Sequence, residues 1–138
     1  MKVLIHSALP LCAIAVLVSA ARASELTKES LDAVQKNLTD KKAVLVDVRE
    51  KSEWDKGHIE GAIFLPLSKL QKDIDPVALA KLLPNDKIVY THCVAGVRSV
   101  KAGNVLEKLG YKVRPLKPGY KELVEFGFKN ADETSTRN

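Results

Sequence analysis

Cysteine is scarce in this chain of 138 residues, which contains only Cys12 and Cys93. Cys12 lies in an N-terminal segment that we expect to be removed, so Cys93 would be the only cysteine of the mature protein. A single cysteine forms no internal disulfide, and the domain must therefore be held together by its apolar core. The length gives room for one such core.

Long basic runs, repeats and linkers are also missing. The formal net charge is +5, but no five basic residues follow one another and no aromatic residues alternate with basic ones. The sequence therefore disfavours a nucleic-acid-binding surface and predicts no nucleic-acid partner. Without an internal repeat or low-complexity block, we expect one domain over residues 24–129 and a flexible tail over 130–138.

One long apolar run is present, over residues 3–18, and it lies directly at the N-terminus after Lys2. It is followed by Ala21-Arg22-Ala23, a pattern typical of signal-peptide cleavage, which predicts a signal peptide over residues 1–23. An uncleaved anchor is the less favoured alternative, because a membrane-spanning helix needs about 20 apolar residues. We expect an exported protein, periplasmic or secreted, monomeric and not stably attached to a membrane after cleavage.

Apolar and β-branched runs alternate with helical patterns along the rest of the chain. The runs predict strands over residues 43–48, 63–65, 87–92 and 112–116. The helical patterns predict a first helix capped by Thr27 and ending near Asp40, then helices over 76–83, 99–109 and 120–126. Strands that alternate with helices in this way predict an α/β fold with parallel strands and right-handed crossovers.

Polar residues interrupt the chain where two of these strands end. Asp47-Val48-Arg49 closes the first strand, and the segment from Cys93 to Arg98 follows the third. The carboxyl ends of parallel strands meet at one edge of the sheet, where ligands bind in open α/β folds. We therefore expect both segments to contribute to one site.

The segment after the third strand suits a reactive thiolate. Cys93 stands between a strand and a helix, and Gly96 permits the positive φ that turns successive backbone N–H groups inward. Such groups, together with the positive end of the helix dipole, lower the pKa of a thiol. Cys93 is therefore the predicted nucleophile, and a small anion is the predicted ligand of the loop.

Several separated motifs resemble the rhodanese homology domain, over about residues 26–128. They are Cys93-x-x-Gly96-x-Arg98-Ser99, Asp47-Val48-Arg49-Glu50, Glu53-Trp54, Gly57-His58-Ile59-x-Gly61-Ala62 and Leu109-Gly110-Tyr111. Together with the N-terminal segment, they make the chain similar to small exported single-domain rhodaneses. The resemblance implies a doubly wound, mostly parallel five-stranded sheet flanked by helices.

The resemblance also implies a sulfurtransferase activity of the thiosulfate type. Cys93 would attack the outer sulfur of a small anionic donor and keep that sulfur as a covalent persulfide. A thiol or cyanide would then accept the sulfur. No cofactor is implied beyond this covalent intermediate, and no metal site is expected, because adjacent strand residues such as His92 and Cys93 point to opposite faces.

The expected roles of the other residues follow from their place near Cys93. Those expected to bind substrate are Val94, Ala95, Gly96, Val97, Arg98 and Arg49. Those expected to support the site structurally are Asp47, His58 and Ser99. For Arg98 two roles stay open: it holds an anionic donor, or it braces the loop by pairing with Glu50 or Asp47.

Two other functions compete with sulfur transfer catalysis. The first is a small phosphatase or arsenate reductase, because related dual-specificity phosphatases also place an arginine shortly after a His-Cys pair. Those loops have one more residue between cysteine and arginine than the four found here, so the loop of this chain favours a sulfur over a phosphate. The second is a non-enzymatic sulfur carrier or docking module.

Overall fold

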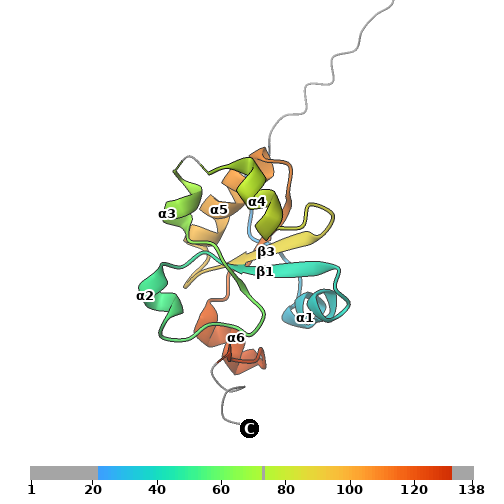
Figure 1. Cartoon of the computed structure of the whole chain (residues 1–138). Coiled ribbons are helices and arrows are strands. Elements are labelled where there is room, and N and C mark those ends of the chain that lie inside the picture. The colour runs from blue at the N-terminus through green and yellow to red at the C-terminus, as the bar shows by residue number, and fades with distance from the viewer. Residues whose placement is uncertain (1–21, 73, 132–138) are drawn as a thin grey trace, which may run out of the picture.

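The computed structural model describes residues 22–72 and 74–131 (Figure 1). Most of the expected signal peptide, residues 1–21, and most of the expected tail, residues 132–138, lie outside the described part of the chain. Within that part, no helix has the length and apolar character needed to cross a membrane.

The described residues form one parallel sheet of four strands. These are β1 (Ala43–Asp47), β2 (Ile63–Phe64), β3 (Ile88–His92) and β4 (Lys112–Pro115), in the order β2-β1-β3-β4. All three strand pairs are parallel, as the alternating pattern predicts. The fifth strand implied by the resemblance is absent from the described residues. The segment before the first helix runs beside β4, but Thr27 N–H donates to Pro115 O there at 2.8 Å without a ladder of paired residues.

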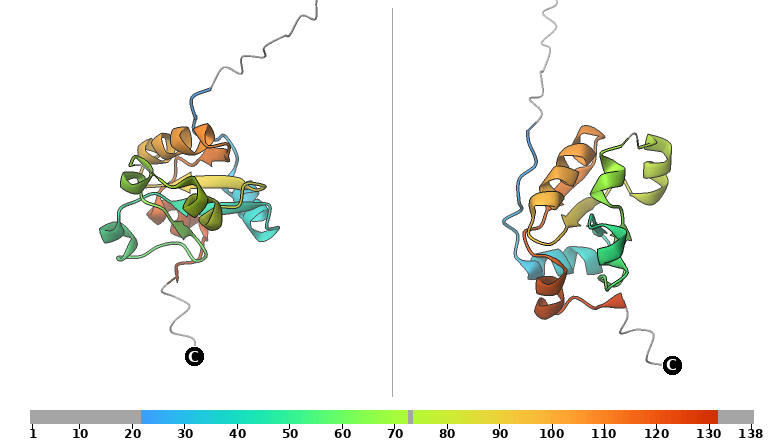
Figure 2. Two further views of the ribbon diagram at one scale, coloured as in Figure 1. Left: turned by 45° about the horizontal axis from the view of Figure 1, so that its top comes forward. Right: turned by 90° about the vertical axis from the view of Figure 1, so that its left-hand side faces the viewer.

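Helices lie on both sides of this sheet, so the fold is doubly wound (Figures 1 and 2). They are α1 (Leu31–Thr39), α2 (Lys51–Trp54), α3 (Leu67–Leu70), α4 (Pro76–Leu82), α5 (Val97–Lys108) and α6 (Tyr120–Phe126). α3, α4 and α5 cover one face, and α1 and α6 cover the other. The α/β architecture predicted from the sequence is confirmed.

Each face of the sheet has its own apolar core. Val46 of β1 packs with residues of α3, α4 and α5, whereas its neighbour Leu45 packs with residues of α1 and α6. Successive strand side chains point to opposite faces, and here both faces are covered. This double burial explains why the inner strands β1 and β3 are nearly continuous apolar runs, whereas the edge strand β4 alternates exposed and buried residues.

The structure differs from the expected elements at two places. α1 begins at Leu31, and its N-cap is Ser30, whose Oγ accepts from Ala33 N–H at 3.3 Å. The predicted cap, Thr27, is wrong, because its backbone N–H is bonded to Pro115 O and the helix begins three residues later than this cap requires. The short helices α2 and α3 were not predicted, since four residues are too few to show a helical period.

The chain remains paired slightly beyond the expected domain boundary. Asn130 forms an isolated antiparallel bridge with Ile59, and Ala131 N–H donates to His58 O at 2.9 Å. These contacts tie the end of the described chain to the segment that follows α2.

Candidate active site

The ends of β1 and β3 lie side by side and place the two polar segments together. Asp47 stands opposite His92 in the parallel register, and Val48 N–H donates to His92 O at 3.1 Å. The segments that follow these strands, with Arg49 after β1 and Cys93 after β3, therefore leave the sheet at the same edge. This is the edge at which open α/β sheets bind ligands.

Cys93 sits in a loop whose backbone surrounds the sulfur. Gly96 has φ of +94°, and its N–H donates to Cys93 Sγ at 3.2 Å. Burial of the thiol raises its pKa, but hydrogen bonds from the backbone N–H groups of Ser99, Ala95, Gly96 and Arg98 together outweigh this effect, so the pKa is lowered. The loop therefore stabilises a thiolate through its backbone.

Hydrogen bonds of two side chains and one close backbone contact hold the Cys93 loop in shape. Ser99 Oγ lies 2.6 Å from Gly96 O and 2.8 Å from Leu116 O, so it ties the loop to the end of β4. Thr91 Oγ1 donates to Ser99 O at 3.0 Å. At the side, Gly119 packs so closely against the Val94 carbonyl that a β-carbon at this position would overlap it.

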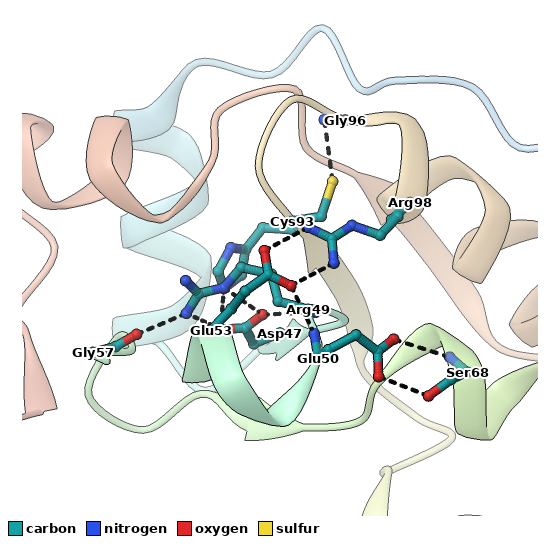
Figure 3. A network of polar contacts seen from close by, with 10 residues as sticks. Asp47, Arg49, Glu50, Glu53, Gly57, Ser68, Cys93, Gly96 and Arg98 are labelled. Carbon is teal, nitrogen blue, oxygen red and sulfur yellow. Dashed lines mark hydrogen bonds and ion pairs between the residues drawn. The ribbon is translucent and has the colours of Figure 1, made fainter. Parts of the chain in front are cut away.

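Arg98 points from the loop toward α2 and forms a two-pronged ion pair with Glu53 (Figure 3). Arg98 Nη1 lies 2.6 Å from Glu53 Oε2, and Nη2 lies 2.7 Å from Oε1. The hydrogen bond from Arg98 is the main cause that lowers the pKa of Glu53 to about 2, and the same bond raises the pKa of Arg98. The loop is thus braced, but by Glu53 rather than by Glu50 or Asp47.

Arg49 is buried and its guanidinium is engaged on several sides. Its Nη2 lies 2.7 Å from Asp47 Oδ2 and donates to Gly57 O at 2.8 Å. Asp47 also accepts from the Arg49 backbone N–H and Nε, each at 3.0 Å. The guanidinium carbon lies 4.7 Å from the centre of the Tyr120 ring. Arg49 therefore connects β1, the turn at Gly57 and the start of α6.

His92 lies next to the pair formed by Asp47 and Arg49, and the sequence predicted no role for it. Its side chain is fully buried, and among the described residues neither ring nitrogen has a hydrogen-bond partner. Its Nε2 is 3.6 Å from Asp47 Oδ2. Burial lowers the pKa of His92 more than the nearby Asp47 raises it. A neutral imidazole therefore fills the space between the two strand ends.

His58 lies in the turn that follows α2, where its contacts are with Trp54. Its ring stacks on Trp54 with a centroid distance of 3.6 Å and an interplanar angle of 10°. His58 Nδ1 also lies 3.2 Å from Trp54 O. These contacts fix the turn in which the Gly57 carbonyl accepts a hydrogen bond from Arg49.

The outer part of the loop is apolar and faces solvent. Val94 is 58% exposed and Val97 is 65% exposed, although Cys93 itself is only 2% exposed. A cavity of about 480 Å³ adjoins the loop at Val94 and the brace at Glu53. It is lined by Arg49, Glu53, Lys56, Val94, Gly119, Tyr120, Lys121 and Glu122.

Several of these lining residues were not predicted from the sequence as part of the site. Lys56 comes from the turn after α2, and Tyr120 and Lys121 come from α6, far from Cys93 in the chain, and no motif marks them. The start of α6 is brought to the loop only because Gly119 packs against Val94. Across residues 22–72 and 74–131, no group of three or more His, Cys, Asp or Glu side chains could hold a metal ion.

Curated proteins are similar in sequence to part of this chain. The chain is 34% identical over 95 residues to the putative sulfur carrier protein YrkF of Bacillus subtilis, covering 68% of this chain and 48% of that protein. It is 36% identical over 81 residues to the putative mitochondrial thiosulfate sulfurtransferase of Schizosaccharomyces pombe, covering 53% of this chain and 56% of that protein. The chain thus spans about half the length of these relatives.

Solved structures share the fold over most of their length. The human single-domain sulfurtransferase TSTD1 superposes with a TM-score of 0.61 and is 29% identical, covering 70% of this chain and 94% of that one. The family model described as rhodanese-like domain matches residues 30–125, which include every strand and the whole Cys93 loop. The chain therefore belongs to the rhodanese-like domain family.

Proposed function

We propose that this protein is a sulfurtransferase that carries a sulfane sulfur on Cys93 as a persulfide. The observation that supports this proposal is the ring of backbone N–H groups around Cys93 Sγ, one of them at 3.2 Å. Such a ring stabilises a thiolate and, equally, a persulfide anion one bond longer. The sulfurtransferase names of the S. pombe and human relatives support the same chemistry.

The first half-reaction takes sulfur from a thiosulfate-type donor. The Cys93 thiolate attacks the outer sulfur, a new bond forms to Sγ, and the bond to the sulfonate sulfur breaks. The electron pair of that bond leaves with sulfite, so no proton has to be moved by a general base. His92 is fully buried with its Nε2 3.6 Å from Asp47 Oδ2, and this step does not require it as a base.

The second half-reaction returns the sulfur to a thiophilic acceptor, a thiol or cyanide. The acceptor attacks the outer sulfur, and the electron pair of the breaking bond returns to Cys93 Sγ as the thiolate. The backbone N–H groups are supplied throughout by Ala95, Gly96, Arg98 and Ser99, while the exposed Val94 and Val97 form the outer edge of the loop. Arg98 acts in this proposal as the brace of the loop through Glu53, and a direct contact with substrate is not required.

The place of action is part of the same proposal. The N-terminal pattern of residues 1–23 supports export to the periplasm or the exterior, with the domain acting there as a monomer. Fractionation of cells that express the full chain, with N-terminal sequencing of the product, tests the cleavage. A product that retains residues 1–23 in the cytosolic fraction would contradict it.

The function itself is tested by intact-mass measurement after incubation with thiosulfate. The wild type is expected to gain one sulfur atom, which a reductant removes, and Cys93→Ala is expected to gain none. Addition of cyanide to the loaded protein should release one thiocyanate, and with thiosulfate still present the release should repeat over many turnovers. Hydrolysis of phosphate esters without any sulfur gain would instead support the phosphatase alternative and overturn sulfur transfer.

A second role, that of a sulfur carrier, is favoured by one observation, the similarity to the putative sulfur carrier of B. subtilis. Fast loading of Cys93 followed by slow release to cyanide and small thiols would support the carrier role. Fast release on every turnover supports the enzyme.

A further inference from the structure

Residues 24–27, here called the N-terminal strap, run beside α5 and β4 before α1 begins (Figure 2). At the start of the strap, Ser24 N–H donates to Asn104 Oδ1 of α5 at 2.7 Å. At its end, Thr27 N–H donates to Pro115 O of β4 at 2.8 Å. The strap is therefore attached to the fold at both of its ends.

The sequence of α5 makes room for the start of the strap. Gly103 lies in the interior of this helix, where glycine is less favourable than alanine. A β-carbon at Gly103 would overlap Ser24 Oγ and the ring of Pro115. Ser24 itself is only 6% exposed. The helix thus has an unfavourable residue at the place where the strap packs, which indicates that this contact is a built part of the fold.

Leu26 lies between the two attached ends of the strap and packs on the Cys93 loop. The position that a β-carbon of Gly96 would occupy is 3.0 Å from Leu26 Cδ2, 3.3 Å from Lys117 Cα and 3.6 Å from Leu116 O. Gly96 has φ of +94°, and its N–H donates to Cys93 Sγ. The side of Gly96 on which other residues carry a side chain is therefore covered by Leu26 and by the backbone that follows β4.

A glycine in a turn depends on its surroundings to keep one conformation. Glycine adopts positive φ about as readily as negative φ, so Gly96 by itself does not keep its N–H directed at the sulfur. Atoms packed against the glycine restrict its movement instead. Leu26 is 38% exposed and is part of neither apolar core, so its packing matters mainly to the loop.

We propose that Leu26 is a positioning residue for Cys93, because it holds Gly96 in the turn that directs the Gly96 N–H at the sulfur. This inference rests on the proposed function for its catalytic consequence. The same N–H stabilises the thiolate that attacks the donor and the thiolate that is regenerated when the acceptor leaves. In this role Leu26 acts through Gly96 and not on the reacting atoms. The attached ends of the strap keep Leu26 in place, so their loss should act in the same direction.

The test follows two reactions of Cys93 over a range of pH, alkylation by iodoacetamide and loading with thiosulfate. In Leu26→Ala the hydrogen bond to the thiolate should weaken, so the pH midpoint of both reactions should rise. Below the midpoint, both rates should fall about three- to tenfold, the factor that corresponds to one weakened hydrogen bond. Above the midpoint, where Cys93 is a thiolate in both proteins, the rates of the variant and the wild type should converge.

Three further variants separate positioning from a general loss of stability. Leu26→Met restores a long apolar side chain and should keep the midpoint of the wild type. The matched control, Leu82→Ala, removes the same atoms from a leucine of α4 that is 41% exposed, and should change stability in urea without moving the midpoint. Asn104→Ala detaches the start of the strap and should raise the midpoint by less than Leu26→Ala does.

Several outcomes would overturn the inference. The first is an unchanged midpoint in Leu26→Ala, or in Asn104→Ala where Leu26→Ala does not fold. The others are an equal rise of the midpoint in Leu82→Ala, a failure of Leu26→Met to restore the midpoint, and a loss of rate that is equal below and above it. A wild type that gains no sulfur from thiosulfate would overturn the proposed function, whereas a higher alkylation midpoint in Leu26→Ala would still support the positioning of Cys93.

Discussion

Arg98 holds both carboxylate oxygens of Glu53, at 2.6 and 2.7 Å, and so joins the Cys93 loop to α2. The Glu53 carboxylate also accepts Glu50 N–H at 3.0 Å, which fixes it at the start of that helix. Both partners are partly exposed, at 28% and 32% of their side chains. The loop arginine is therefore committed to a protein carboxylate, and its charge is balanced within the fold.

Glu53→Gln is expected to lower the free energy of unfolding by about 1 kcal/mol, because a two-pronged pair between two elements is lost. Urea denaturation at neutral pH measures this change. Asp55→Asn, two residues further on, breaks the more exposed pair with Lys51 and should cost less than about 0.5 kcal/mol. Equal losses in the two variants would show that the Arg98 brace contributes no more than a surface pair.

The stabilisation by Glu53 should depend on pH in a defined direction. Its pKa is about 2 in the folded protein, against an ordinary value of 4.5. A lowered folded pKa means that the stabilisation is complete above pH 4.5 and is lost as the pH falls toward 2. The stability difference between the wild type and Glu53→Gln should therefore shrink steadily across this window. A stability difference between the two proteins that stayed constant down to about pH 2 would contradict the lowered pKa of Glu53.

The reactivity of Cys93 should depend on the backbone of Gly96. In the wild type, the rate of alkylation by iodoacetamide should rise with a midpoint below the ordinary thiol pKa of 9.0. Gly96→Ala places a β-carbon at φ of +94°, 3.3 Å from Lys117 Cα, so the loop must shift and the thiol pKa should rise. Alkylation at neutral pH should then slow severalfold.

The control for that variant is Gly110→Ala. Gly110 has nearly the same φ, +91°, but nothing lies within 4 Å of its β-carbon position. It therefore reproduces the conformational cost, about 1 kcal/mol, without moving the loop. An unchanged alkylation profile in Gly96→Ala would show that the pKa of Cys93 does not depend on this turn.

Asp47→Asn is expected to destabilise the fold by about 3 kcal/mol, because it leaves the buried Arg49 without a charge partner. The two side chains are 0% and 6% exposed, so water cannot replace the lost carboxylate. Asp40→Asn, which removes an exposed partner of Lys36, should cost far less, because water screens that pair. Thermal or urea unfolding compares the two variants, and similar small losses in both would contradict the buried-pair interpretation.

Local patterns in the sequence were enough to predict the strands and the environment of Cys93. The inner strands β1 and β3 could be predicted because their residues are buried on both faces and are mostly apolar. The anion-binding loop could be predicted because its geometry depends on neighbours within a few residues, above all Gly96. The cap of α1 and the missing fifth strand could not, because both depend on the contact between Thr27 and Pro115, which are far apart in the chain.

The sequence by itself determined that Cys93 follows a buried strand, precedes a helix and has a glycine three residues on, which together make it a candidate nucleophile. Only the tertiary structure decided which acid pairs with Arg98. Asp47, Glu50 and Glu53 lie close to one another in the sequence, but only Glu53, 45 positions before Arg98, binds its guanidinium. Only the tertiary structure brought Lys56 and Lys121 to the same cavity. The reason is physical: short-range backbone geometry is encoded by neighbouring residues, whereas charge pairing depends on which side chains the packed sheet and helices bring within reach.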